Sequence, residues 1–302
     1  MSKIPYTKKF FDDLRENTLR SARKIVPIVM DLINPKSVID VGCGVGIWLA
    51  EFQKSGIDEF IGVDGEYIDP SSLVIPETKF RAVDLNKPFQ LERRFDLVVC
   101  LEVAEHLPED NAEQFMDSLT KLGNCILFSA AIPFQGGEDH LNEQWPEYWA
   151  SLFSKKNYIL IDYFRERIWN NQEVEWWYAQ NMVLFIRERA KKNFPTLFQE
   201  FKKVKNTGLS LIHPRNYLHA IWMKQYYQAL NKLNHVITPR EAYGLIDDGM
   251  FGYETIESNA VLFLVEDGIY LGPPRNDDEA IHEIKRIQIN GAHFIVFLWP
   301  AF

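Results

Sequence analysis

The sequence predicts an α/β fold in which a mostly parallel sheet has helices on both faces. Apolar runs without alternation, such as SVIDVG at 37–42 and FDLVVCL at 95–101, indicate strands that are buried on both faces. Segments with helical periodicity separate these runs, which predicts parallel strands joined by helices. The last two predicted strands are instead joined by a polar and aromatic loop, which predicts an antiparallel hairpin at the sheet edge.

The elements of this sheet follow one another in a regular order. Residues 7–24 have helical periodicity, and Pro27 is well placed to open a second helix through Leu32. Further helices are expected at 46–56, 111–122 and 145–156. Seven strands are expected, at 37–42, 60–64, 79–84, 95–101, 124–131, 158–164 and 178–186.

Domain boundaries follow from where this pattern stops. The sheet-forming domain is predicted to cover 1–187, and a helical linker to cover 188–239. Pro195 and Pro214 are expected to interrupt the helices of this linker. A small α/β accessory module is predicted at 240–302, with its elements at 260–272, 278–291 and 293–302. The chain stops almost on the last predicted strand, which is the pattern of a truncated domain.

Composition and charge exclude several classes of protein. The hydrophobic share of 46% and the charged share of 25% are ordinary for a globular chain. The net charge of −9 argues against a general nucleic-acid binder, which needs a basic surface. No segment approaches the roughly 18 apolar residues that span a bilayer. The N-terminus lacks the apolar core of a signal peptide and the cysteines suit reduced thiols, so we expect a cytoplasmic protein.

A glycine-rich turn joins the first strand to the following helix. Gly42, Gly44 and Gly46 let the backbone pass close to a ligand, at the strand ends where open parallel sheets bind ligands. A dinucleotide site is the obvious rival, but its spacing is G-x-G-x-x-G, whereas here it is G-x-G-x-G. Asp40 places a carboxylate in the preceding strand, which suits a cationic ligand better than a pyrophosphate.

Two more carboxylates follow at successive strand ends. Asp64 ends the second strand, where it can accept hydrogen bonds from both ribose hydroxyls of a nucleoside. Asp84 ends the third strand and is positioned to meet an adenine amino group. Together with the glycine turn, these residues predict a site for a sulfonium nucleoside cofactor.

Four segments at these positions resemble the motifs of the class I S-adenosylmethionine methyltransferase superfamily. They are VIDVGCGVGIWL, IGVDG, FRAVDLN and FDLVVCLEVAEHL, and the resemblance covers about residues 20–187. It implies a Rossmann-like, doubly wound sheet of seven strands, with S-adenosylmethionine as cofactor. It also implies a set of cofactor contacts. The methionine portion would contact Asp40, Gly42, Gly44 and Gly46, and the ribose would contact Asp64. The adenine would contact Asp84 and Leu85, the open side of the cofactor would face Leu101 and Glu102, and Trp48 is a further member of the set.

A narrower resemblance concerns the acceptor. The run SAAIPFQGG, HLNEQWPEYW and IWNNQEVEWWYAQN resembles a bacterial group found with glycosyltransferases in polysaccharide and glycoconjugate gene clusters. The segment YLGPPRNDDEAIHEIKRIQINGAHFIVF resembles a small domain that accompanies such proteins. This resemblance implies a small-molecule or glycan acceptor. A homodimer is one option for the assembly.

Methyl transfer to a sugar hydroxyl needs a general base or a metal, because the hydroxyl is a poor nucleophile. Candidates lie at 102–106, after the fourth strand, and at 138–143, after the fifth. His140 is the first choice for the base, because histidine titrates near the working pH, although it could instead cap the following helix. Glu105 and His106 are the other catalytic candidates. For His106, the alternative to a catalytic role is a structural role.

The same region raises the question of a metal. Glu102, Glu105, His106 and His140 resemble the Glu-x-x-Glu-His plus distant His arrangement of metal-dependent RNA 3′-terminal 2′-O-methyltransferases. That resemblance implies Mg²⁺ or Mn²⁺ holding a vicinal diol through both oxygens, and two imidazoles would favour Mn²⁺ or Fe²⁺.

Three functions stay open from the sequence. The favoured one is O-methylation of a saccharide or sugar nucleotide, since aromatic faces suit sugar rings and the region after the fifth strand is rich in Trp and Tyr. Core packing is the competing explanation for those aromatic residues. The first alternative is a ribose 2′-O-methyltransferase acting on RNA or a nucleoside, which the acidic charge disfavours. The second is a non-catalytic scaffold that binds the cofactor.

Overall fold

The structure of the chain, a computed structural model, describes most of the first two thirds of the sequence and parts of the remainder. The described residues are 8–137, 139–201, 208–221, 224, 242–246, 260–262, 265–266, 269–270 and 274–297. The chain divides into two compact units, one of Asp13–Ile221 and one that combines Met1–Asp12 with Trp222–Phe302.

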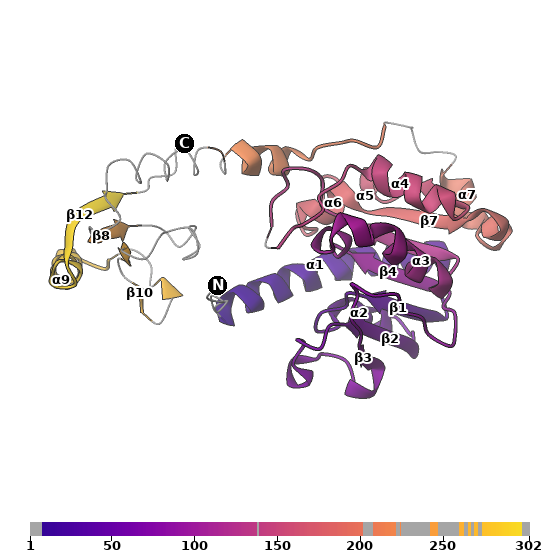
Figure 1. The fold of residues 1–302 in the computed structure, drawn as a ribbon, viewed down its shortest axis with the longest axis horizontal. Coiled ribbons are helices and arrows are strands. Elements are labelled where there is room, and N and C mark those ends of the chain that lie inside the picture. Colours follow the sequence, from indigo (N-terminus) through magenta and orange to yellow (C-terminus); the bar gives the residue numbers. More distant parts are fainter. Residues whose placement is uncertain are drawn as a thin grey trace. The chain divides into compact units, whose positions relative to one another are not determined.

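The larger unit contains a seven-stranded sheet with the order β3-β2-β1-β4-β5-β7-β6 (Figure 1). Every neighbouring pair is parallel except those formed by β7, which is antiparallel to both β5 and β6. The predicted fold class, with its antiparallel edge hairpin, is therefore confirmed. The strands are β1 (Ser37–Val41), β2 (Glu59–Asp64), β3 (Phe80–Ala82), β4 (Leu97–Leu101), β5 (Cys125–Ser129), β6 (Tyr158–Ile161) and β7 (Val183–Arg187).

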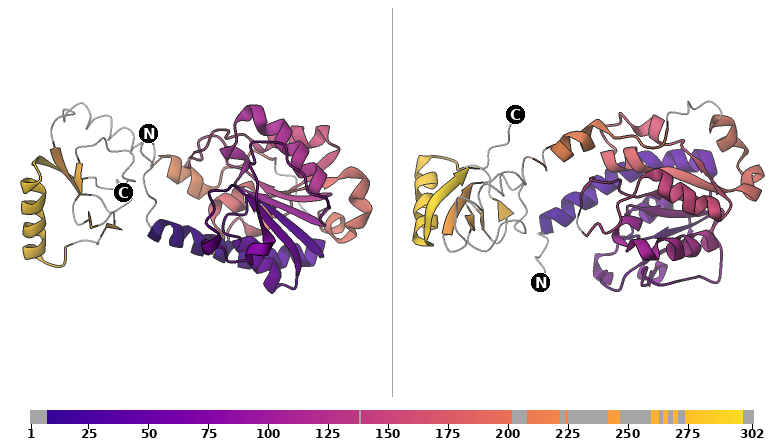
Figure 2. Two further views of the ribbon diagram at one scale, coloured as in Figure 1. Left: turned by 60° about the horizontal axis from the view of Figure 1, so that its bottom comes forward. Right: turned by 45° about the horizontal axis from the view of Figure 1, so that its top comes forward.

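The central strands of the sheet contribute side chains to two separate cores, because successive residues point to opposite faces. Val38 and Leu97 belong to the core that α1 (Lys8–Ile33) and α2 (Ile47–Lys54) cover. Ile39 and Val98 belong to the core that α3 (Ala112–Leu122) and α4 (Pro146–Lys155) cover. Figure 2 shows the sheet between these helical layers. Burial on both faces explains why the central strands β1, β4 and β5 are mostly apolar rather than alternating, whereas β3 at the edge is largely exposed.

Short helices complete the larger unit. Those after β2 and β4 are the 3₁₀ turns η1 (Pro70–Ser72), η2 (Glu77–Lys79), η3 (Ala104–His106) and η4 (Glu109–Asn111). Those from β6 onward are α5 (Arg165–Ile168), α6 (Trp176–Asn181), η5 (Glu188–Asn193) and α7 (Pro195–Phe201), and residues 214–221 are also helical.

The N-terminal segment differs from the prediction of two helices. It forms the single helix α1, with Pro27 inside it. Pro27 lies on the exposed side of the helix, while Ile25, Val26 and Val29 are fully buried against the sheet. The buried apolar face stabilises the helix. Because Pro27 has no N–H, the carbonyl group four residues earlier lacks its helical donor, and on this exposed side water can donate to it instead.

The last predicted strand of the sheet also begins later than expected. Residues 178–181 belong to α6, and pairing with β5 starts only at Val183, opposite Phe128. Gln180 and Asn181 are buried, and their side-chain amides bond to other polar side chains rather than to a strand. Their polar character is the physical reason why the strand stops short of them.

Residues 188–201 and 208–221, which lie in the predicted linker, are part of the larger unit. Arg165, which is fully buried, donates hydrogen bonds to the carbonyl oxygens of Gly208 (3.1 Å) and Leu209 (2.6 Å). Asp162 balances its charge through a bidentate pair. The boundaries at 187 and 239 stay a prediction of domain organisation.

The smaller unit has an α/β character, as the sequence pattern indicates. A parallel three-stranded sheet has the order β12-β8-β9, and β10 pairs with β11 in an antiparallel hairpin. Its elements are β8 (Ala242–Ile246), β9 (Ala260–Leu262), β10 (Val265–Glu266), β11 (Ile269–Tyr270), α9 (Asp277–Ile289) and β12 (Ala292–Phe297). Asn276 caps α9 by accepting the N–H of Glu279 at 2.9 Å.

Two further expectations concern the whole chain. Among the helices of the described residues, none combines the length and the apolar character that a bilayer crossing requires. Cys43, Cys100 and Cys125 are buried free thiols, which agrees with the prediction of reduced cysteines. The cytoplasmic location stays a prediction.

Candidate active site

The candidate site lies where the strand order of the sheet reverses. β1 is flanked by β2 on one side and by β4 on the other, so the loops that leave β1 and β4 diverge at the carboxyl ends of the strands. In open α/β sheets, ligands bind at this edge. The predicted cofactor residues follow β1, β2, β3 and β4, and the predicted acceptor residues follow β4 and β5.

The glycine-rich turn after β1 has a backbone that only glycine adopts easily. Gly42, Gly44 and Gly46 have φ values of 78°, 53° and 89°. A Cβ at Gly42 would lie 2.3 Å from the Val103 side chain, and one at Gly46 would lie 2.8 Å from Ile75. A Cβ at Gly44 would meet no atom of the chain within 4 Å. Gly42 and Gly46 thus serve packing, whereas Gly44 leaves space beside the loop for a ligand.

Asp64 ties the end of β2 to this turn. Its Oδ2 accepts the backbone N–H of Gly44 at 2.7 Å, and its Oδ1 accepts the N–H of Gly65 at 2.7 Å and the hydroxyl of Tyr67. The side chain is almost fully buried. The structure therefore brings the predicted ribose carboxylate into contact with the predicted cofactor loop.

Asp40 is a buried carboxyl group with an unsatisfied oxygen. Among the described residues, none donates a hydrogen bond to its Oδ2. Burial, and then the nearby charge of Asp64, raise the pKa of Asp40 from its ordinary value of 3.8 to about 8. A buried carboxyl without a partner is costly, and a cationic ligand would relieve that cost. This supports the prediction that Asp40 suits a sulfonium cofactor.

The other predicted cofactor residues differ in their surroundings. Trp48 is buried and packs edge-on against Tyr178, with ring centroids 5.2 Å apart. Asp84 is exposed and pairs with Lys87 at 2.9 Å. That pair holds the pKa of Asp84 below its usual value. Leu85 is half-buried, and its contact with adenine stays a prediction.

Glu102 follows β4 in a conformation that is unusual for a non-glycine residue. Its φ is 53°, and Leu101 before it is buried. Gln135 donates to Oε2 at 3.0 Å, and Asn181 donates to both carboxylate oxygens at 3.2 and 3.3 Å. Burial raises the pKa of Glu102, although these donors and the Ser129 hydroxyl act in the opposite direction. The strain and the two amide donors fix the direction of this carboxylate.

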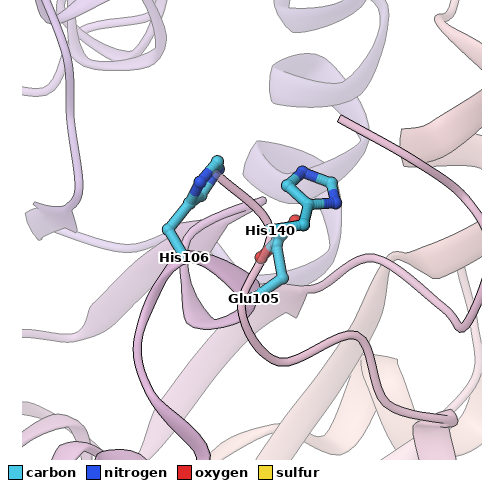
Figure 3. Close-up of side chains that lie close together, drawn as sticks. All are labelled: Glu105, His106 and His140. Atoms are coloured by element: carbon cyan, nitrogen blue, oxygen red, sulfur yellow. The ribbon is translucent and has the colours of Figure 1, made fainter. Parts of the chain in front are cut away.

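Three of the four predicted metal ligands come together in the structure. One ligand atom from each of Glu105, His106 and His140 lies within 4.8 Å of the others. Figure 3 shows the two imidazoles side by side, with Glu105 next to them. Their rings are 4.9 Å apart and nearly perpendicular. Glu102 is not part of this group among the described residues, although its carboxyl group interacts with that of Glu105.

Glu105 is the most deeply buried member of this cluster. Its Oε1 accepts the N–H of Ala131 at 3.0 Å, while Oε2 has no partner among the described residues. Burial, and then the charge of Glu102, raise the pKa of Glu105 well above its usual value. His106 is on the exposed side, and partial burial, together with the charge of His140, lowers its pKa. An unpartnered carboxyl oxygen beside two imidazoles fits the ligand preferences of a divalent metal.

His140 is oriented by a second carboxylate. Its Nδ1 lies 2.9 Å from Oε1 of Glu143, which also accepts the backbone N–H of Gly136 (2.8 Å), while Oε2 accepts that of Phe134 (2.7 Å). Burial opposes ionisation of Glu143, but these three hydrogen bonds lower its pKa below the usual value. Gly137 passes close over the ring, since a Cβ there would lie 2.3 Å from Nε2 of His140. Glu138 lies outside the described residues.

A network of buried amides beside the site was not predicted from the sequence. Oε1 of Gln135 accepts from Asn181 at 2.9 Å and from Gln180 at 3.1 Å. Oε1 of Gln180 in turn accepts the backbone N–H of His213 at 2.9 Å and the side chain of Asn216 at 3.0 Å. The network connects Glu102 to the 208–221 segment. The pair Gln-Asn directly before an apolar strand was the signal that could have indicated it.

The aromatic residues after β5 divide between the two explanations that the sequence left open. Trp149 and Tyr178 are buried in the two cores, and Trp177 packs against one of them, so packing accounts for these three. Phe134 and Trp145 are exposed, and both flank the segment that carries His140. Tyr148, Trp169 and Trp176 are half-buried, so the core does not fully enclose them either.

The match of residues 11–181 to a family model described as a methyltransferase domain decides the assignment. The chain belongs to the methyltransferase-domain family. The match covers more than half of the chain. A methyltransferase domain agrees with the predicted cofactor, S-adenosylmethionine.

Curated relatives resemble this methyltransferase domain over part of their length. Identity is 30% over 115 residues to a mitochondrial ubiquinone biosynthesis O-methyltransferase from Dictyostelium discoideum, covering 31% of this chain and 34% of that protein. Identity is 27% over 143 residues to a ubiquinone biosynthesis O-methyltransferase from Coxiella burnetii. That match covers 39% of this chain and 58% of that protein. The chain thus spans less than two thirds of the length of either relative.

A solved structure resembles the domain at lower identity. The sugar N-methyltransferase KedS8 from a Streptoalloteichus species is 12% identical, with a TM-score of 0.48. The similarity covers 62% of this chain and 95% of that one.

Proposed function

We propose that the chain transfers a methyl group from S-adenosylmethionine to a hydroxyl of a saccharide or sugar nucleotide, with His140 as general base. The observation that carries this proposal is the His140–Glu143 pair at the edge of the site. An imidazole held at Nδ1 by a carboxylate keeps Nε2 available to take a proton, and the carboxylate stabilises the imidazolium that forms.

The residues after β1 and β2 fit the cofactor. The space beside Gly44 would take part of the ligand, Asp64 would accept ribose hydroxyls, and Asp40 would lie close to the cationic portion. When bound, S-adenosylmethionine supplies an electrophilic methyl group to a nucleophile in line with the carbon–sulfur bond. His140 would remove the acceptor proton as the new bond forms, and Glu102 and Phe134 would border the acceptor.

Three further observations support an oxygen acceptor and a sugar. The curated relatives are named as O-methyltransferases. The exposed aromatic side chains of Phe134 and Trp145 offer the kind of surface on which sugar rings stack. The resemblance of the segments around 129–181 to proteins of polysaccharide gene clusters points in the same direction.

A second candidate is metal-dependent methylation of a vicinal diol. The grouping of Glu105, His106 and His140 supports it, together with the unpartnered Oε2 of Glu105. A divalent cation there would lower the pKa of a bound hydroxyl, and His140 would then be a ligand rather than a base. A sugar diol and the ribose of a nucleoside or RNA 3′ end are both acceptors of this kind. The net charge of −9 disfavours the RNA.

The test is an S-adenosylhomocysteine-release assay with a panel of sugar nucleotides, free glycans, nucleosides and a short RNA. Each acceptor is assayed with EDTA and with added Mn²⁺. Turnover of a saccharide in EDTA supports His140 as base, whereas turnover only with Mn²⁺ supports the metal-dependent candidate. Cofactor binding without turnover of any acceptor supports the non-catalytic scaffold.

A further inference from the structure

Tyr67 occupies part of the hydrogen-bonding capacity of Asp64. An ionised carboxylate offers about four lone-pair sites, two on each oxygen. Oδ1 of Asp64 accepts both the N–H of Gly65 and the hydroxyl of Tyr67, while Oδ2 accepts the N–H of Gly44. Three of these sites are therefore taken by the chain itself.

A ribose has two neighbouring hydroxyls and needs two acceptor sites on this carboxylate. One donor of the chain must therefore leave when both hydroxyls bind. Gly44 lies in the cofactor loop and Gly65 directly follows β2, so their backbone N–H groups are fixed by the fold. Tyr67 donates from a side chain and is 81% exposed. Of the three donors, only the Tyr67 hydroxyl can move away without disturbing the sheet.

The sequence around Tyr67 is suited to this position of the ring. Gly65 has no side chain, and a Cβ at this residue would lie 2.1 Å from Cε1 of Tyr67. The ring thus lies over the backbone at the end of β2, beside the carboxylate. A larger residue at 65 would push the ring off this position and free Asp64.

We infer that Tyr67 is a gate residue of the cofactor site, whose hydroxyl competes with the ribose for Asp64. This inference rests on the proposed S-adenosylmethionine-dependent function. The hydroxyl satisfies the buried carboxylate in the structure described here, and an incoming ribose takes its place. Tyr67 accordingly weakens cofactor and product binding, and thereby favours release of S-adenosylhomocysteine.

The experiment measures affinities of wild type and Tyr67→Phe by calorimetric titration. The ligands are S-adenosylhomocysteine, adenosine, and 2′,3′-dideoxyadenosine, which lacks both ribose hydroxyls. Removing the competing hydroxyl should tighten binding of the first two ligands by roughly three- to tenfold, the range of one net hydrogen bond. Binding of dideoxyadenosine should not change. Tyr217→Phe, an equally conservative change at another exposed tyrosine, is the matched control and should leave all affinities unchanged.

The outcomes separate this inference from the proposed function. Wild type that binds S-adenosylhomocysteine while Tyr67→Phe binds it no more tightly overturns the gate alone. A gain that extends to dideoxyadenosine also overturns it, since competition for Asp64 needs the ribose hydroxyls. A gain that persists in the Asp64→Ala background overturns it as well, because the two residues would then act independently. Wild type that binds no S-adenosylhomocysteine overturns the proposed function and the gate with it.

Discussion

Nδ1 of His140 lies 2.9 Å from Oε1 of Glu143, and the same carboxylate accepts the backbone N–H groups of Phe134 and Gly136. Glu143 therefore fixes both the ring of the proposed base and the loop over it. Because the hydrogen bonds keep the pKa of Glu143 low, the carboxylate is ionised at neutral pH and can stabilise a protonated His140.

His140→Ala should lower the rate constant of methyl transfer by roughly 10²- to 10⁴-fold, which is the contribution of a positioned general base. Glu143→Gln should lower it less, because an amide keeps part of the loop contacts but cannot stabilise the imidazolium. The measurement is the initial rate of S-adenosylhomocysteine release at saturating cofactor. The dissociation constant of S-adenosylhomocysteine is the control and should stay the same. A His140→Ala variant with the wild-type rate would remove His140 from the mechanism.

His106→Ala distinguishes the base from the metal-dependent candidate. His106 neighbours His140 but has no part in the His140–Glu143 pair. If His140 acts as base, His106→Ala should change the rate by only a few-fold. If a cation is held by Glu105, His106 and His140, the variant should lose activity at low Mn²⁺ and recover part of it at high Mn²⁺. The measurement is the rate as a function of Mn²⁺ concentration, with EDTA-treated wild type as reference.

Asp40 should make the stability of the ligand-free protein depend on pH. Its pKa is raised from 3.8 to about 8 on folding, so the folded state holds a proton that the unfolded state loses. Stability from this group is therefore complete below pH 4 and is lost as the pH rises towards 8, at up to roughly 1.4 kcal/mol per pH unit. Asp40→Asn should remove this contribution. Relative to wild type, the free energy of unfolding of the variant should therefore be higher at pH 8 than at pH 5. Urea unfolding of both proteins across this range provides the test, and parallel profiles would contradict it.

Gly44→Ala and Gly42→Ala should fail in different ways. Both residues have positive φ, so each substitution carries a strain of about 1 kcal/mol. At Gly42 the methyl group would also press on the buried Val103 side chain, which should lower the melting temperature strongly. At Gly44 it would point into open space, so the protein should fold but bind S-adenosylhomocysteine weakly. Thermal unfolding and calorimetry on both variants check this pair. A Gly44→Ala protein with wild-type affinity would mean that no ligand approaches there.

The sheet could be predicted because its central strands are buried on both faces and are therefore mostly apolar. The same criterion failed for residues 178–181, where Tyr178 and Ala179 read as the start of a strand but Gln180 and Asn181 are held by buried amide bonds. It also failed at Pro27, because the sequence does not reveal that the proline faces solvent while its neighbours are packed.

The candidate site was predictable to the extent that strand ends define it. Asp40, Asp64 and the glycine turn meet because their strands are adjacent and parallel. The roles of Glu143 and Tyr67 depend on loop conformations that no periodicity encodes. The hydrogen bonds that Glu102 accepts from Gln135 and Asn181 likewise come from distant segments, which a spacing pattern does not contain.

The most direct test of the central claim is calorimetric titration of S-adenosylhomocysteine into the purified wild-type protein, with and without Mn²⁺. We expect saturable binding at one site per chain in both conditions, and clearly weaker binding by Asp64→Ala. Absence of binding heat in both conditions, from protein shown to be folded, would contradict an S-adenosylmethionine-dependent methyltransferase.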